Sequence, residues 1–345
     1  MHEDYRSCHR AGQEKRIETR EQPDDQQNRA EELGVGGDVS EKRGDVVVRQ
    51  IGGEGSRTSP AEDLRVAMRD EDQPEGHAQN QGGNVARPPF HDRVITPLAL
   101  FVCFYLAIFW ISVWSGLGYF QWVALGCACC ATWATIALWH HGRWDLGLAP
   151  RFAPRELAIG AGFAVALIGS ADVLILVLTP SHHLRGTGFP WAVTAAMFIP
   201  GALHEELIFR GYPYQIVRQF NRPLAMVASS LVFAGLHGWN SDVTTLALVN
   251  IFLGGAILAL AYERYRRLWL PIGLHFAWNV LSGPILGYDV SGFTPGKSLL
   301  VAVVQGPAIL TGGEFGIEGS IILTGMEIFA VGLLLRRTGM LNVEC

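Results

Sequence analysis

About eight apolar segments, each as long as a bilayer-crossing helix, occupy residues 94–345 of this 345-residue chain. A helix needs about 20 mostly apolar residues to cross the hydrocarbon core of a membrane. Because backbone groups in lipid must bond within their own segment, each of these segments is predicted to be a helix. The sequence therefore predicts an all-α polytopic membrane protein with about eight transmembrane helices. The predicted spans are 94–114, 119–139, 157–178, 189–209, 224–240, 243–262, 268–287 and 319–335.

A ninth apolar stretch, residues 298–310, is shorter than a span and contains Gly306 and Pro307. Both residue types interrupt helices. We interpret this stretch as a re-entrant or interfacial piece.

Arginines in the connecting segments predict the orientation of the chain. Cytoplasmic loops of membrane proteins carry an excess of Lys and Arg. With eight spans, every second connection is rich in arginine and the opposite connections hold almost none, Arg185 excepted. We therefore expect both termini in the cytoplasm, in a bacterial-type cell membrane. The arginines that support this orientation are Arg143, Arg151, Arg155, Arg218, Arg222, Arg264, Arg266, Arg267, Arg336 and Arg337.

The first 93 residues differ sharply from the rest of the chain. They hold 20 of the 32 acidic and 14 of the 27 basic residues, and their aromatic residues are Tyr5 and Phe90. Such a composition is too polar to build a core and predicts disorder. The predicted domains are a disordered cytoplasmic tail at 1–93, a transmembrane domain at 94–337 and a short tail at 338–345. The net charge of −5 comes almost wholly from the N-terminal tail, and no nucleic-acid partner is expected.

Polar residues interrupt the apolar segments at three places, the first of which is HEELIFRG. Charged side chains at bilayer depth are costly and often functional. Residues four apart share a helix face, so Glu206 and Arg210 are predicted to form an ion pair. Glu205 projects to a neighbouring face and remains free for another task. His204, directly before the pair, is interpreted as a packing residue.

The second place pairs Phe233 with His237, and the third pairs His275 with Asn279, each four residues apart. Taken singly, such residues fit hydrogen-bonded packing, a structural clasp or a proton relay in a transporter. Together they supply a carboxylate, imidazoles and an amide, which are the groups that hydrolysis needs as a base and as oxyanion donors. A zinc-protease HExxH motif is excluded because position 208 is Ile.

The three motifs EExxxR, FxxxH and HxxxN, in this order, resemble the CPBP family, the CAAX-processing and bacteriocin-processing (Abi) intramembrane proteases. FRG at the first motif and YERYRRLWLPIGLHFAWN around the third extend the likeness, which covers about residues 190–285. The resemblance implies an intramembrane endopeptidase whose core lies there. Its implied partners are membrane lipid and a peptide or protein substrate, with or without a prenyl group.

The resemblance also implies roles for individual residues. Glu205 activates the attacking water with His237 as its partner, and His275 and Asn279 stabilise the oxyanion. Glu206 and Arg210 serve architecture and positioning. In an alternative mechanism, Glu205, His237 and His275 ligate a divalent metal ion, Zn²⁺ first, as in other catalytic zinc sites. An alternative function is a non-catalytic membrane module that binds a partner protein or a lipidated peptide.

Overall fold

The computed structural model describes residues 91–116 and 121–338. All of them belong to one compact unit, Ala78–Asn342. The predictions for residues 1–90, which make up most of the N-terminal tail, and for residues 339–345 lie outside the described residues.

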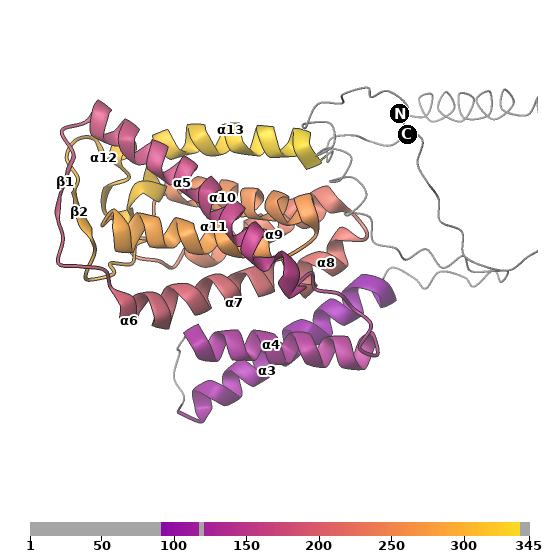
Figure 1. Cartoon of the computed structure of the whole chain (residues 1–345). Coiled ribbons are helices and arrows are strands. Elements are labelled where there is room, and N and C mark those ends of the chain that lie inside the picture. Colours follow the sequence, from indigo (N-terminus) through magenta and orange to yellow (C-terminus); the bar gives the residue numbers. More distant parts are fainter. Residues whose placement is uncertain (1–90, 117–120, 339–345) are drawn as a thin grey trace, which may run out of the picture. The chain divides into compact units, whose positions relative to one another are not determined.

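Five helical stretches of the described part are long and apolar enough to cross a membrane. The prediction of a helical integral membrane protein is therefore confirmed, and Figure 1 shows helices running through the described part. The five stretches are His91–Trp114 with α3 (Thr96–Trp114), Gln121–Trp139 (α4), Pro150–Leu178 with α5 (Ala153–Leu178), Trp191–Arg218 with α6 (Trp191–Val193), α7 (Ile199–Phe209) and α8 (Tyr212–Arg218), and Thr245–Tyr265 (α10).

The predicted count of eight spans is not confirmed. Helices also form in the other three predicted spans, as α9 (Arg222–His237), α11 (Trp269–Val280) and α13 (Ile321–Thr338). However, α9 has 16 residues, and α11 with the π-helical turn Leu281–Ile285 that continues it ends at Ile285, so both lie near the lower limit for a bilayer crossing. α13 has 18 residues but carries Glu327 and an arginine pair in its last turn.

Two short strands depart from the all-helical prediction. β1 (His182–Arg185) pairs antiparallel with β2 (Leu300–Val303), and His182 lies opposite Val303. They lie together at one end of the helices (Figure 1). The stretch 298–310 thus contains a strand and the start of the short helix α12 (Ala308–Thr311). Its Leu-Val-Ala-Val segment is rich in residues that favour strands, and β1 supplies the backbone partners.

A glycine sets the turn between α7 and α8. A Cβ atom at Gly211 would lie 2.1 Å from the carbonyl oxygen of Leu207, so the chain turns there only without a side chain. α7 therefore ends at Phe209, and Arg210 follows as its C-cap residue. This turn places the Arg210 side chain beside the helix that carries both glutamates.

Glycines also bring α5 and α11 into close contact. A Cβ atom at Gly160 would lie 2.4 Å from the carbonyl oxygen of Leu270, and one at Gly273 would lie 2.6 Å from Cα of Leu157. Small residues let helix backbones approach closely in membrane proteins. This contact helps to hold α11, which carries His275.

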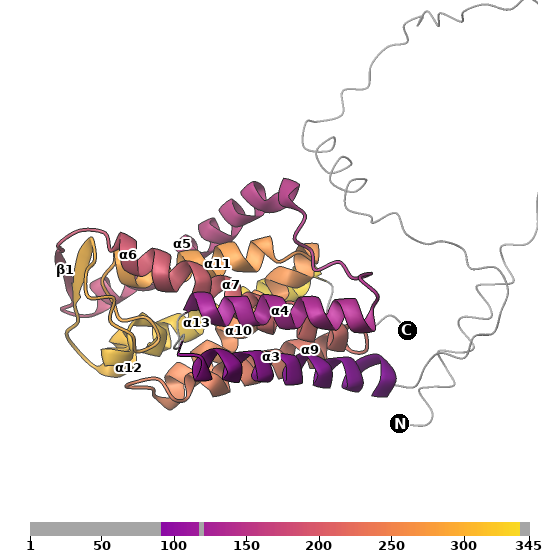
Figure 2. The same cartoon turned by 90° about the horizontal axis from the view of Figure 1, so that it is seen from below.

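α3 and α4 lie side by side in both views (Figures 1 and 2). The pair contacts α7 through side chains: Tyr105 of α3 hydrogen-bonds His204 of α7, with 3.0 Å between Oη and Nε2. The first two predicted spans therefore cover the helix that carries the first motif.

Candidate functional site

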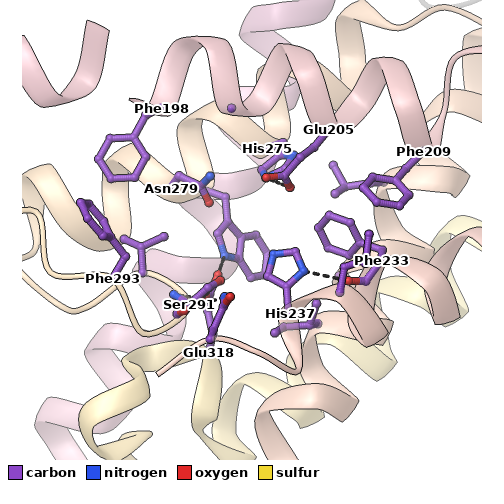
Figure 3. Close-up of a pocket in the computed structure, with 18 of the residues that line it drawn as sticks. Phe198, Glu205, Phe209, Phe233, His237, His275, Asn279, Ser291, Phe293 and Glu318 are labelled. Atoms are coloured by element: carbon purple, nitrogen blue, oxygen red, sulfur yellow. Dashed lines mark hydrogen bonds and ion pairs between the residues drawn. The ribbon is translucent and has the colours of Figure 1, made fainter. Parts of the chain in front are cut away.

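A cavity of about 710 Å³ lies among α7, α9, α10, α11 and α13. Glu205, His237, His275 and Asn279 all line it, although they come from three separate motifs (Figure 3). Much of the remaining lining is aromatic, including Phe198, Phe209, Phe233, Trp278 and Phe293. A mostly apolar cavity with a few convergent polar groups is the usual form of a ligand site.

The predicted ion pair of the first motif is present and fully buried. Arg210 Nη1 lies 3.0 Å from Glu206 Oε1, and both side chains are 0% exposed. Arg210 Nη2 also donates to the carbonyl oxygen of Gly255 in α10, at 2.8 Å. Neither Glu206 nor Arg210 lines the cavity, so the pair forms part of the structure behind it.

His275 is tied to the same ion pair. Its Nδ1 donates to Glu206 Oε1 at 2.8 Å, because a carboxylate paired with arginine accepts hydrogen bonds. Its Nε2 lies 3.7 Å from Oε2 of Glu205. The sequence did not indicate this link between the first and third motifs, which orients the imidazole toward Glu205.

Glu205 differs from its neighbour in both exposure and partners. Its side chain is 24% exposed, against 0% for Glu206. No described residue donates a hydrogen bond to its Oε2 atom, whereas Glu206 accepts from Arg210 and His275 at Oε1. Glu205 is therefore a carboxylate that borders the cavity and can accept a proton or hold a water molecule.

The ring of His237 is fixed by its own helix. Its Nδ1 donates to the carbonyl oxygen of Phe233 at 2.8 Å, since a carbonyl can only accept (Figure 3). In the neutral ring Nε2 is consequently an acceptor. The centre of the Phe233 ring lies 4.6 Å from the centre of the His237 ring. The Arg210 guanidinium carbon lies 4.8 Å from the centre of the same Phe233 ring. Phe233 thus joins the first two motifs, which explains its place in FxxxH.

The alternative prediction is a metal site at Glu205, His237 and His275. Among the described residues, no group of three or more His, Cys, Asp or Glu side chains is placed to hold a metal ion. Glu205 and His275 approach each other, and both imidazoles donate through Nδ1, His275 to Glu206 and His237 to Phe233, which leaves Nε2 of each ring for a further partner. Metal binding by Glu205, His237 and His275 stays a prediction.

Three further residues border the cavity and were not singled out as functional. Glu318 and Glu327 bring two more carboxylates, and His204, interpreted above as packing, lines the cavity while bonded to Tyr105. A signal for Glu327 was present, because it lies in the middle of the apolar segment IILTGMEIFAVGLLL. Like Glu205, it is a carboxylate within an apolar segment, where charged side chains are costly and often functional.

The fold and the cavity define a helical integral membrane protein with a buried carboxylate, imidazole and amide site. Residues 187–281 match the family model described as "Type II CAAX prenyl endopeptidase Rce1-like". The resemblance predicted from the three motifs is therefore confirmed over a segment that contains all six predicted site residues.

One curated relative is the UPF0177 protein YvdC of Lactococcus lactis subsp. lactis (strain IL1403), which is 23% identical over 137 residues. The match covers 37% of this chain and 51% of that protein, so the chain spans about half the length of this relative. No solved structure matches this chain.

Proposed function

We propose that this chain is an intramembrane endopeptidase in which Glu205 activates water for hydrolysis of a peptide bond. One observation carries the proposal: a carboxylate without a hydrogen-bond partner at Oε2 borders a cavity beside two imidazoles and an amide. The match of residues 187–281 to an endopeptidase family model supports the same activity.

Glu205 is the proposed general base. It takes a proton from a water molecule, whose oxygen attacks the carbonyl carbon of the substrate's peptide bond. Nε2 of His237 accepts a hydrogen bond from the remaining O–H of that water and orients it, and this hydrogen stays on the attacking oxygen. Glu205 then passes the proton to the leaving nitrogen, which completes the cleavage.

His275 and Asn279 are the proposed oxyanion donors. Negative charge develops on the carbonyl oxygen during attack, and donors in a poorly hydrated cavity stabilise it strongly. The Asn279 amide supplies one donor, and a protonated Nε2 of His275 supplies the other. Glu206 and Arg210 act as positioning residues, because the carboxylate of Glu206 holds Nδ1 of His275.

The proposed substrate is a peptide or protein segment that enters the cavity from the membrane. The aromatic lining suits apolar side chains or a lipid group, and a prenylated C-terminus is the substrate class in the description of the family model. The proposed setting is a bacterial-type cell membrane with both termini in the cytoplasm.

A peptide-cleavage assay on purified protein in nanodiscs tests this function. We expect cleavage of apolar peptides, prenylated or not, by the parent chain. Glu205→Gln should lower the rate by a factor of about 10² to 10⁴, the usual contribution of a general base. The control is Glu314→Gln, because Glu314 is exposed and does not line the cavity. Undiminished turnover in Glu205→Gln rules out the mechanism, and no cleavage by the parent favours the non-catalytic binding module.

The same assay decides the metal alternative. A chelator and elemental analysis of the purified protein are applied in parallel. Cleavage that persists after complete metal removal excludes a catalytic ion at Glu205, His237 and His275. If cleavage stops with the chelator and returns when Zn²⁺ is added, the metal mechanism replaces the metal-free one.

A further inference from the structure

Polar groups from α13 and the turn before it form part of the cavity wall, and most of them are satisfied. Glu318 accepts hydrogen bonds from Trp278 Nε1 at 2.7 Å and from the Ser291 backbone and hydroxyl at 2.6 and 2.7 Å. Asn250 of α10 donates to the carbonyl oxygens of Glu318 and Ser320 and accepts from Thr324. These residues are tied to their neighbours and have a structural explanation.

Glu327 has none. It is 1% exposed, lines the cavity, and its Oε2 atom has no hydrogen-bond partner among the described residues. Its Oε1 atom lies 3.4 Å from the place that a Cβ atom would take at Gly254. The carboxyl group thus lies against Gly254 of α10, within van der Waals contact of a side chain at that position.

The charges around the cavity are unbalanced. Among the described residues, its lining includes Glu205, Glu318 and Glu327 and no Lys or Arg, and its basic side chains are the imidazoles of His204, His237 and His275. The nearby Arg210 is already bonded to Glu206 and Gly255. A buried carboxylate without a counter-charge is costly. An ionisable group at membrane depth therefore indicates a functional site that pairs with another charged or polar group.

We propose that Glu327 forms a subsite for a cationic side chain, Lys or Arg, of the peptide that occupies the cavity. This inference rests on the proposed endopeptidase function. Glu205 and Glu327 line the same cavity, so one peptide can present its backbone to Glu205 and a basic side chain to Glu327. The alkyl stem of Lys or Arg suits the apolar wall, and its charge reaches the carboxylate. The subsite makes the protein selective for substrates with a basic residue at a fixed distance from the cleaved bond.

The experiment compares apolar decapeptides that carry one lysine with matched peptides that carry norleucine, which has a similar stem without the charge. The lysine is placed at each position in turn. For the parent chain, kcat/KM at one position should favour lysine by at least about 30-fold, the usual loss when a buried charge lacks its partner. In Glu327→Gln this preference should fall to near unity, while Glu314→Gln should retain it. In Glu327→Lys, kcat/KM should instead favour a matched peptide that carries glutamate at the same position over the lysine peptide.

A binding measurement keeps this inference separate from the proposed function. The affinities of the lysine and norleucine peptides are measured on Glu205→Gln protein, with and without Glu327→Gln. A lysine preference that depends on Glu327 supports the subsite even when no peptide is cleaved, an outcome that contradicts only the endopeptidase. Equal affinity and equal kcat/KM for the two peptides at every position, on chains with Glu327 intact, overturn the subsite.

Discussion

Glu205 and Glu206 are neighbours in the chain, but the fold gives them opposite surroundings. Glu206 is fully buried and serves both Arg210 and His275, at 3.0 and 2.8 Å. Glu205 is partly exposed at the cavity and has no hydrogen bond at Oε2. The difference follows from the turn of about 100° between successive helical residues, which points one carboxylate into the protein and the other into the cavity.

Removing the Asn279 amide should slow cleavage without unfolding the protein. Asn279→Ala removes one proposed oxyanion donor, so kcat should fall by a factor of about 10² to 10³. KM should change little, because the interaction forms in the transition state. Steady-state kinetics in nanodiscs measure both constants. A rise in KM at constant kcat would instead assign Asn279 to substrate binding.

Breaking the buried pair should affect stability before chemistry. Glu206→Gln or Arg210→Ala strands a charge at a fully buried position, which costs about 3–5 kcal/mol. Both variants should therefore show lower melting temperatures and poorer expression. Changing both residues to apolar ones should destabilise less than the sum of the single changes, because no charge is stranded. A double variant that is fully additive would show that the two side chains act independently.

At the scale of the helices, the contact between α5 and α11 aligns the third motif with the first. Gly273 lies two residues before His275, and its missing Cβ lets α11 rest against the backbone at Leu157. Any shift of α11 changes the position of His275 relative to Glu206.

Gly273→Ala should therefore reduce both stability and activity. The added Cβ would lie 2.6 Å from Cα of Leu157, so α5 and α11 must separate, and overpacking of this kind costs about 1–3 kcal/mol. The control is Gly162→Ala in α5, because nothing lies within 4 Å of its added Cβ. Thermal unfolding and cleavage rates are measured for both. A Gly273→Ala protein as stable and active as Gly162→Ala would contradict a tight contact here.

At the scale of the whole described unit, the arginine-rich ends of several helices lie together. Arg218 and Arg222 both bond Glu263, near the end of α10, at 2.6 and 3.1 Å. Arg222 also donates to the carbonyl oxygen of Thr338, at the end of α13. The connections that the positive-inside rule assigns to one side of the membrane are thus neighbours in space.

We expect this end to face the cytoplasm, because cationic loops are retained there during insertion. In a chain whose six native cysteines are replaced by serine, Arg264→Cys and Lys297→Cys provide single labels at exposed positions. A membrane-impermeant thiol reagent added to intact cells should label position 297 and leave position 264 unlabelled. Labelling of position 264 from outside would reverse the predicted orientation.

Local patterns were sufficient to predict part of this protein. Apolar runs of about 20 residues depend only on hydropathy, so the helical membrane fold followed from them, although the count of eight spans is not confirmed. The ion pair of Glu206 and Arg210 joins residues four apart on one helix turn, and the spacing alone indicated it. The three motifs also contain Glu205, His237, His275 and Asn279, which line one cavity.

Only the tertiary structure decided the contacts between residues far apart in the chain. The bond between His275 and Glu206 spans 69 positions, and the pairing of β1 with β2 spans more than 100. That Glu327 Oε2 has no hydrogen-bond partner in the described part of the chain likewise depends on which side chains of other helices reach it. Hydropathy and helical periodicity carry no information on such partners, because packing between helices selects which polar groups meet and which remain unpaired.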